Sequence, residues 1–241
     1  MLLRRILIIA AFSLALAPNG IAQDLRSKLG QKADFVPEAR LAKDALIEIA
    51  AHYKIAMGIE WAYDTRPSRA ILLTPQPTVE DMINLVLSQA PGYSKNISKG
   101  VVSIRKENFA GDRRNFLTFR LADYRVRNAN VFGAEWQLRV NIHRALHPEN
   151  YASGLNGGYG QPDRGDGFNI RDISFERENV TVREILDAIV TNNRNSFWIV
   201  ELNGSKMMRD EPFFVQRTYG TDVQTDFAWR IIPFTVNAAN R

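Results

Sequence analysis

The chain has 241 residues, a formal net charge of +5 at pH 7 and no cysteine. The lack of cysteine excludes disulfides, thiol chemistry and Cys-ligated zinc or iron–sulfur sites. A net charge this small gives no reason to expect the clustered basic face of a nucleic-acid-binding protein.

The first 22 residues have the pattern of a secretory signal peptide. Met1–Arg5 is basic, residues 6–16 are apolar but too few to span a bilayer, and Gly20–Ala22 supplies small residues for a signal peptidase. We expect cleavage after Ala22, which removes two arginines and leaves 29 basic and 26 acidic residues, a net charge of +3. An uncleaved anchor is the alternative. No later run is long and apolar enough for a transmembrane helix, so we expect an exported protein, periplasmic or else extracellular, that is not integral to the membrane.

The remaining chain is expected to form an α+β fold made of two small modules. In each module two helices would pack on a short mixed sheet. The expected divisions are a flexible lead-in at 23–34, a first module at 35–108, a linker at 109–115 and a second module at 116–241.

The first module begins with a helix, predicted from apolar residues at helical spacing between Leu41 and Tyr53. A strand follows over 55–61, and another apolar strand begins at Ile71. Thr78 then caps a second helix, with Asp81 three residues later. The turn at 98–100 predicts a hairpin into a strand over 101–104.

The second module has a strand over 117–121 and then a helix capped by Asn130. A glycine-rich insertion follows at 150–169, longer than an ordinary connection needs. The chain continues as a strand from Ile173, a helix opened by the capping box of Thr181 and Glu184, and a strand over 197–200. Strands over 213–215 and 229–236 are expected to close the chain.

The two capped helices predict an internal repeat. Thr78 corresponds to Thr181 at an offset of 103, and the apolar stripes keep the same register. Strand, cap, helix and strand occur in the same order in both places, although that order is common enough to arise by chance.

The first module resembles the short N-terminal domain of secretins and TonB-dependent receptors. The residues that carry this resemblance are segments 45–51, 58–61, 71–73, 77–87 and 101–104, and a weaker likeness covers 116–202. The resemblance implies a periplasmic module of two βαβ halves that works by protein–protein contact and has no catalytic residues. No secretin or receptor barrel follows in this sequence.

Four other features contain residue types that are found in chemical sites. His143 and His147 have a spacing that zinc can use, but the sequence has no HExxH motif, and a surface pair near a helix C-terminus is the favoured interpretation. Asp163 and Asp166 lack the further oxygen ligands of a calcium loop. The glycines of 154–160 are not followed by the Lys-Ser/Thr of a phosphate-binding loop. The four tryptophans could form a sugar platform, but core packing is the simpler interpretation.

The sequence therefore predicts a non-enzymatic interaction module with no cofactor and no metal, whose partner is a protein of the cell envelope. The glycine-rich insertion is the candidate contact site, because its apolar side chains could enter a partner's pocket and its charged ones could fix the register. The candidate residues are Tyr151, Leu155, Tyr159, Asp163, Arg164, Asp166 and Phe168. The alternative is an envelope hydrolase, with acids and His147 around this insertion, or a carbohydrate-binding protein.

Overall fold

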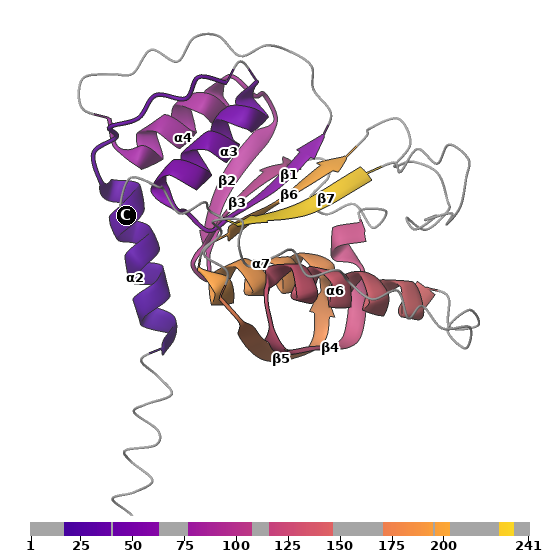
Figure 1. Ribbon diagram of the computed structural model, residues 1–241. Coiled ribbons are helices and arrows are strands. Elements are labelled where there is room, and N and C mark those ends of the chain that lie inside the picture. Colours follow the sequence, from indigo (N-terminus) through magenta and orange to yellow (C-terminus); the bar gives the residue numbers. More distant parts are fainter. Residues whose placement is uncertain are drawn as a thin grey trace, which may run out of the picture.

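The computed structural model describes residues 17–39, 41–62, 77–107, 116–146, 171–194, 196–202 and 227–233. Within these residues the chain has an α+β fold, as the sequence predicts. A five-stranded sheet lies between two groups of helices, and a two-stranded ribbon lies beyond the second group (Figure 1).

The first group of helices covers one face of the sheet. It consists of α2 (Ala17–Gly30), α3 (Ala42–Tyr53) and α4 (Val79–Ser88). The predicted capping box of α4 is confirmed: the Thr78 hydroxyl accepts from the Asp81 amide at 3.1 Å, and the Asp81 carboxylate accepts from the Thr78 amide at 2.9 Å. Two of the helix's first amides therefore have partners within the same turn.

The sheet has the strand order β2-β3-β1-β6-β7. Its strands are β1 (Met57–Ala62), β2 (Tyr93–Ser98), β3 (Val101–Lys106), β6 (Ser196–Leu202) and β7 (Phe227–Pro233). The central strand β1 is parallel to both of its neighbours, β3 and β6, while β2 and β7 pair antiparallel with β3 and β6. The strands of the first predicted module and of the second therefore share one sheet.

The second group of helices covers the opposite face. The elements on this side are the short 3-10 helix η1 (Phe116–Thr118), β4 (Arg120–Ala129), α6 (Val131–Leu146), β5 (Ile173–Thr181) and α7 (Val182–Asn193). β4 and β5 pair antiparallel as a ribbon. The predicted cap of α6 is confirmed by a 2.9 Å bond from the Gly133 amide to the Asn130 side chain.

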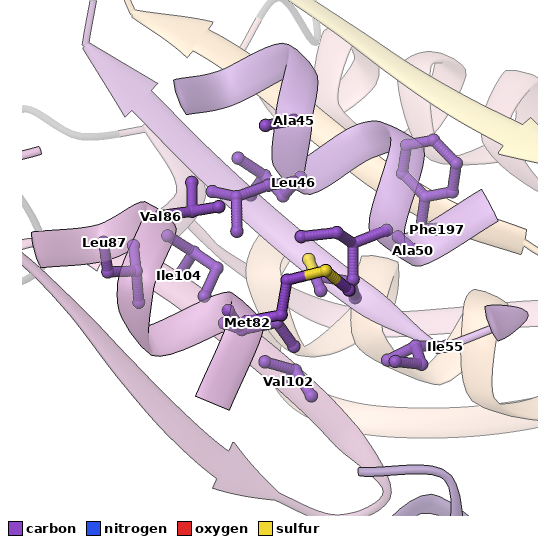
Figure 2. Packing of buried hydrophobic residues seen from close by; sticks show 14 of the residues in the cluster. Ala45, Leu46, Ala50, Ile55, Met82, Val86, Leu87, Val102, Ile104 and Phe197 are labelled. Atoms are coloured by element: carbon purple, nitrogen blue, oxygen red, sulfur yellow. The ribbon is translucent and has the colours of Figure 1, made fainter. Parts of the chain in front are cut away.

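Each face of the sheet has its own apolar core. On the first face, side chains of α3 and α4 meet those of β3 and β6, with Met82, Val102 and Phe197 all inaccessible to solvent (Figure 2). On the second face, α6 and α7 meet the ribbon and the sheet. The predicted core side of α7 is confirmed, because Ile185 and Leu186 are both fully buried there.

The segment at 23–34 differs from its prediction as a flexible lead-in. Residues up to Gly30 belong to α2, which also crosses the expected cleavage position after Ala22. Leu25 and Leu29 are buried in the first core, and beyond the helix the Ala33 amide donates to the Pro77 carbonyl at 2.8 Å. Two leucines four residues apart bury one side of α2, which is too weak a pattern to stand out among polar neighbours.

The shared sheet also changes the interpretation of the predicted modules and repeat. α4 and α7 have matching caps, but after α4 the chain enters the outer strand β2 first and then the inner β3. After α7 it enters the inner β6 first and then the outer β7. The two helices also cover opposite faces. They do not occupy equivalent places with their flanking strands, so the prediction of a superposable repeat is wrong. The predicted linker, 109–115, and the predicted strand at Ile71 lie outside the described residues.

Candidate functional site

The candidate contact residues of the glycine-rich insertion lie outside the described residues. These are Tyr151, Leu155, Tyr159, Asp163, Arg164, Asp166 and Phe168. His147 also lies outside, and of the histidine pair only the backbone of His143, in α6, is described. The insertion therefore stays a prediction, and the candidate site below is built from other residues.

A groove of about 660 Å³ opens between the sheet and the second group of helices. One wall is formed by β2, β3 and their turn, and the other by the start of β4, β5 and α7. Its lining is polar and charged: Asn96, Ser98, Lys99, Ser103, Arg105, Arg120, Arg177, Glu178, Asn179, Val180, Thr181, Arg183, Glu184, Asp187, Ala188, Thr191 and Asn192.

Strand alternation explains why the sheet wall of this groove is polar. Successive side chains of a strand point to opposite faces. Val102 and Ile104 of β3 enter the first core, so Ser103 and Arg105 point to the other face. In β2, Ser98 and Asn96 lie opposite Val101 and Ser103, and they line the groove together with Ser103.

A buried ion-pair network lies beside the groove. Glu60 of β1 is 1% exposed. Arg183 of α7 holds it with two bonds, from Nε to Oε1 at 2.5 Å and from Nη2 to Oε2 at 2.9 Å. Arg105 of β3 places its Nε 3.1 Å from the same Oε1. One carboxylate thus lies between two guanidinium groups that both reach the groove.

Asp187 lies one helical turn beyond Arg183 and also faces the groove. Its Oδ1 accepts a 2.9 Å bond from the indole nitrogen of Trp198, which is 1% exposed. Burial raises the pKa of Asp187 to about 6, against the lowering effects of this hydrogen bond and of the charge on Arg105.

The Trp198 ring is held in place by close contact with the central strand. A Cβ added at Gly58 of β1 would lie 2.4 Å from Cζ2 of the indole, well inside van der Waals contact. Gly58 and Trp198 are also register partners between β1 and β6. Only a residue without a side chain lets the indole approach β1 and reach Asp187.

The charges of the groove differ between its two walls. On the wall of β2 and β3 the charged side chains are Lys99 and Arg105, both cationic. The other wall carries three arginines and three acids, namely Arg120, Arg177, Arg183, Glu178, Glu184 and Asp187. One of those acids, Glu184, belongs to the capping box of α7, where hydrogen bonds from Thr181 lower its pKa. The sheet wall is therefore the positively charged side.

Strand β2 forms one edge of the sheet. Among the described residues no strand pairs with its outer side. The Glu107 amide donates to the Gly92 carbonyl at 3.0 Å, and the Val102 amide donates to Ala56, away from β2. These two bonds set the alternation of the ladder, so Lys95 and Ile97 direct their backbone amides and carbonyls outward. The Ile97 side chain is 39% exposed.

Sequence reasoning missed this network because its partners are distant along the chain. Glu60, Arg105 and Arg183 come from three elements that only the folded sheet brings together. One available signal was an acid within the apolar strand 55–61, since a carboxylate in a buried strand needs a cationic or hydrogen-bonding partner.

Two tryptophans that were considered for a sugar platform are buried on opposite faces of the sheet. Trp61 belongs to the first core and stacks on Tyr93 at a centroid distance of 4.0 Å, whereas Trp198 belongs to the second. These two rings therefore serve core packing. Within the described ranges no three His, Asp or Glu residues are grouped closely enough to hold a metal ion. None of the helices described here combines the length and apolar character needed to cross a membrane.

Comparisons with protein-family models, with curated proteins and with solved structures found no match.

Proposed function

We propose that this chain is an exported, non-enzymatic interaction module of the cell envelope that binds an extended segment of a partner protein. The segment would add as a further strand along the outer edge of β2. The observation that carries this proposal is the edge itself: β2 has six residues, and two of them direct their backbone groups away from the sheet.

The surroundings of β2 support the same function. The exposed Ile97 side chain offers an apolar contact on one face of an added strand. The charged groove offers a second contact on the other face. Main-chain hydrogen bonds would supply affinity, and these two contacts would supply specificity.

Export and the envelope setting rest on the signal peptide pattern of residues 1–22. The resemblance of the first module to the short N-terminal domains of secretins and TonB-dependent receptors agrees with a role in protein contact.

The test uses the outward amide of Ile97. Ile97→Pro removes this donor, and proline is tolerated where an edge strand's N–H faces solvent. Ile97→Thr shortens the side chain but keeps the donor. Partners captured from an envelope extract should be lost with the proline variant and kept with the threonine variant. When the captured partner is added to this protein, hydrogen exchange at the backbone amides of Lys95 and Ile97 should become slower. Equal capture by both variants would move the contact away from β2.

A further inference from the structure

We infer that the segment bound at β2 is acidic on alternate residues, with its acidic side chains over the groove and apolar ones beside Ile97. This inference rests on the proposed strand addition and names the chemistry of the partner. It is argued from the charges on the two faces of the edge.

An added strand has two distinct environments because its side chains alternate between faces. On the face of the first core, the neighbours on β2 are Ile97 and Lys95. Lys95 already lies 2.5 Å from the Glu80 carboxylate of α4. Ile97 is the exposed apolar side chain of β2 on this face, so an apolar side chain of the added strand would pack beside it.

On the groove face the neighbours are hydroxyl, amide and cationic groups. Ser98 and Asn96 lie along β2, Lys99 is exposed at the turn, and Arg105 lies on the next strand. No acid belongs to this wall of the groove. A carboxylate on the added strand would therefore meet hydrogen-bond donors first and positive charge behind them.

The opposite wall carries three acids and three arginines, and two of these arginines, Arg120 and Arg177, donate hydrogen bonds to backbone carbonyls. Arg120 Nη1 donates to the Asn179 carbonyl at 2.5 Å, and Arg177 Nη1 donates to the Glu176 carbonyl at 2.9 Å. The Arg177 guanidinium also lies 5.7 Å from the Phe175 ring centre. A hydrogen bond to a carbonyl does not neutralise a guanidinium, so both arginines keep their charge in the groove. The acids of this wall offset part of that charge, and Glu184 lies near both Lys99 and Arg120.

The buried ion-pair network beside the groove fixes the positions of two of its arginines. Glu60 is shared between Arg105 and Arg183, and the Asp187 carboxylate also lies near both of these guanidiniums. Because Glu60 is buried, an arriving carboxylate cannot replace it without breaking the two bonds from Arg183. The groove thus presents cationic groups whose positions are fixed before binding.

The probes are three end-blocked heptapeptides of alternating sequence. All three place valine at odd positions, and at even positions they carry glutamate, threonine or lysine. Binding is measured by fluorescence anisotropy at low and at high salt. We expect the glutamate peptide to bind at least tenfold more tightly than the threonine peptide, the lysine peptide to bind most weakly, and the differences to shrink at high salt.

Two variants separate this inference from the proposed function. Lys99 has φ of 51°, a conformation that asparagine tolerates, so Lys99→Asn removes the charge and keeps the turn. Lys99→Asn should weaken binding of the glutamate peptide several-fold and leave binding of the threonine peptide unchanged. Ile97→Pro should weaken binding of both peptides.

The outcomes separate the two claims. If the glutamate and threonine peptides bind equally and Ile97→Pro weakens the binding of both, the acidic preference is overturned and strand addition stands. If the glutamate peptide binds the wild type and the Ile97→Pro variant equally well, strand addition at β2 is overturned. If no peptide binds at millimolar concentration, the inference is overturned.

Discussion

Glu60 is a buried carboxylate whose charge is balanced by two arginines from other elements. Replacing such a group by a neutral one leaves two guanidiniums close together without their bridging carboxylate, and only Asp187 remains near them as a counter-charge. We expect Glu60→Gln to lower the free energy of unfolding by about 3–5 kcal/mol in urea titrations. The matched control is Glu176→Gln on the ribbon, where Glu176 pairs with Arg125 and both side chains are exposed. That change should cost under about 1 kcal/mol. Similar costs for the two would mean that the network contributes no more than a surface pair.

Asp187 should make stability depend on pH in the direction opposite to most carboxylates. Its pKa is about 6 in the folded protein, against an ordinary value of 3.8, because burial disfavours the charged form. Between these values the folded state binds more protons than the unfolded state, so this group favours folding as the pH falls through 6 towards 4. Asp187→Asn keeps an oxygen for Trp198 and removes the charge.

We expect the stability of the Asp187→Asn variant, relative to the wild type, to increase with pH. Relative to the wild type, its free energy of unfolding should rise between pH 4.5 and pH 7.5 by about 2 kcal/mol. The comparison with wild type cancels the titration of other groups, such as Glu184, whose pKa is lowered. A difference that stays constant across this range would show that Asp187 titrates as an ordinary surface acid.

At the scale of single elements, Gly58 has no side chain, and this allows the Trp198 indole of β6 to lie directly against β1. Gly58→Ala forces its Cβ against the indole, and the ring has no room to move because it is buried and bonded to Asp187. We expect a loss of about 1–3 kcal/mol in thermal or urea unfolding, with a change in the near-UV circular dichroism of tryptophan. Gly30→Ala is the control, since nothing lies within 4 Å of a Cβ there. It should be neutral or slightly stabilising.

The elements that the sequence predicts best are those that depend on near neighbours. The caps at Thr78, Asn130 and Thr181 involve residues three positions apart, so the chain's local pattern is enough to find them. The turn at Lys99 and Gly100 is found for the same reason. Strand pairing depends on residues far apart. Nothing local to β1 indicates that β6 is its second neighbour, and the groove and its ion pairs depend on that pairing.

At the scale of the whole molecule, the shared sheet makes the two predicted modules depend on each other. A fragment of residues 17–107 contains β1, β2 and β3 but lacks β6 and α7, so β1 has an open edge (Figure 1). Glu60 also loses its partner Arg183. We expect this fragment to unfold without a cooperative transition and to bind a hydrophobic dye, whereas the full chain unfolds cooperatively. A sharp, two-state transition in the fragment would restore the division into independent modules.

The position of β1 between two parallel neighbours also affects the order in which the sheet can form. β3 is available soon after β1 is made, but β6 comes only near the end of the chain, and the second face of β1 stays uncovered until α7 exists. Contacts that close such long loops form late and slowly. A chain of this kind gains little by folding while it is being synthesised. We therefore expect the central sheet to be completed only after α7 and β6 have been synthesised.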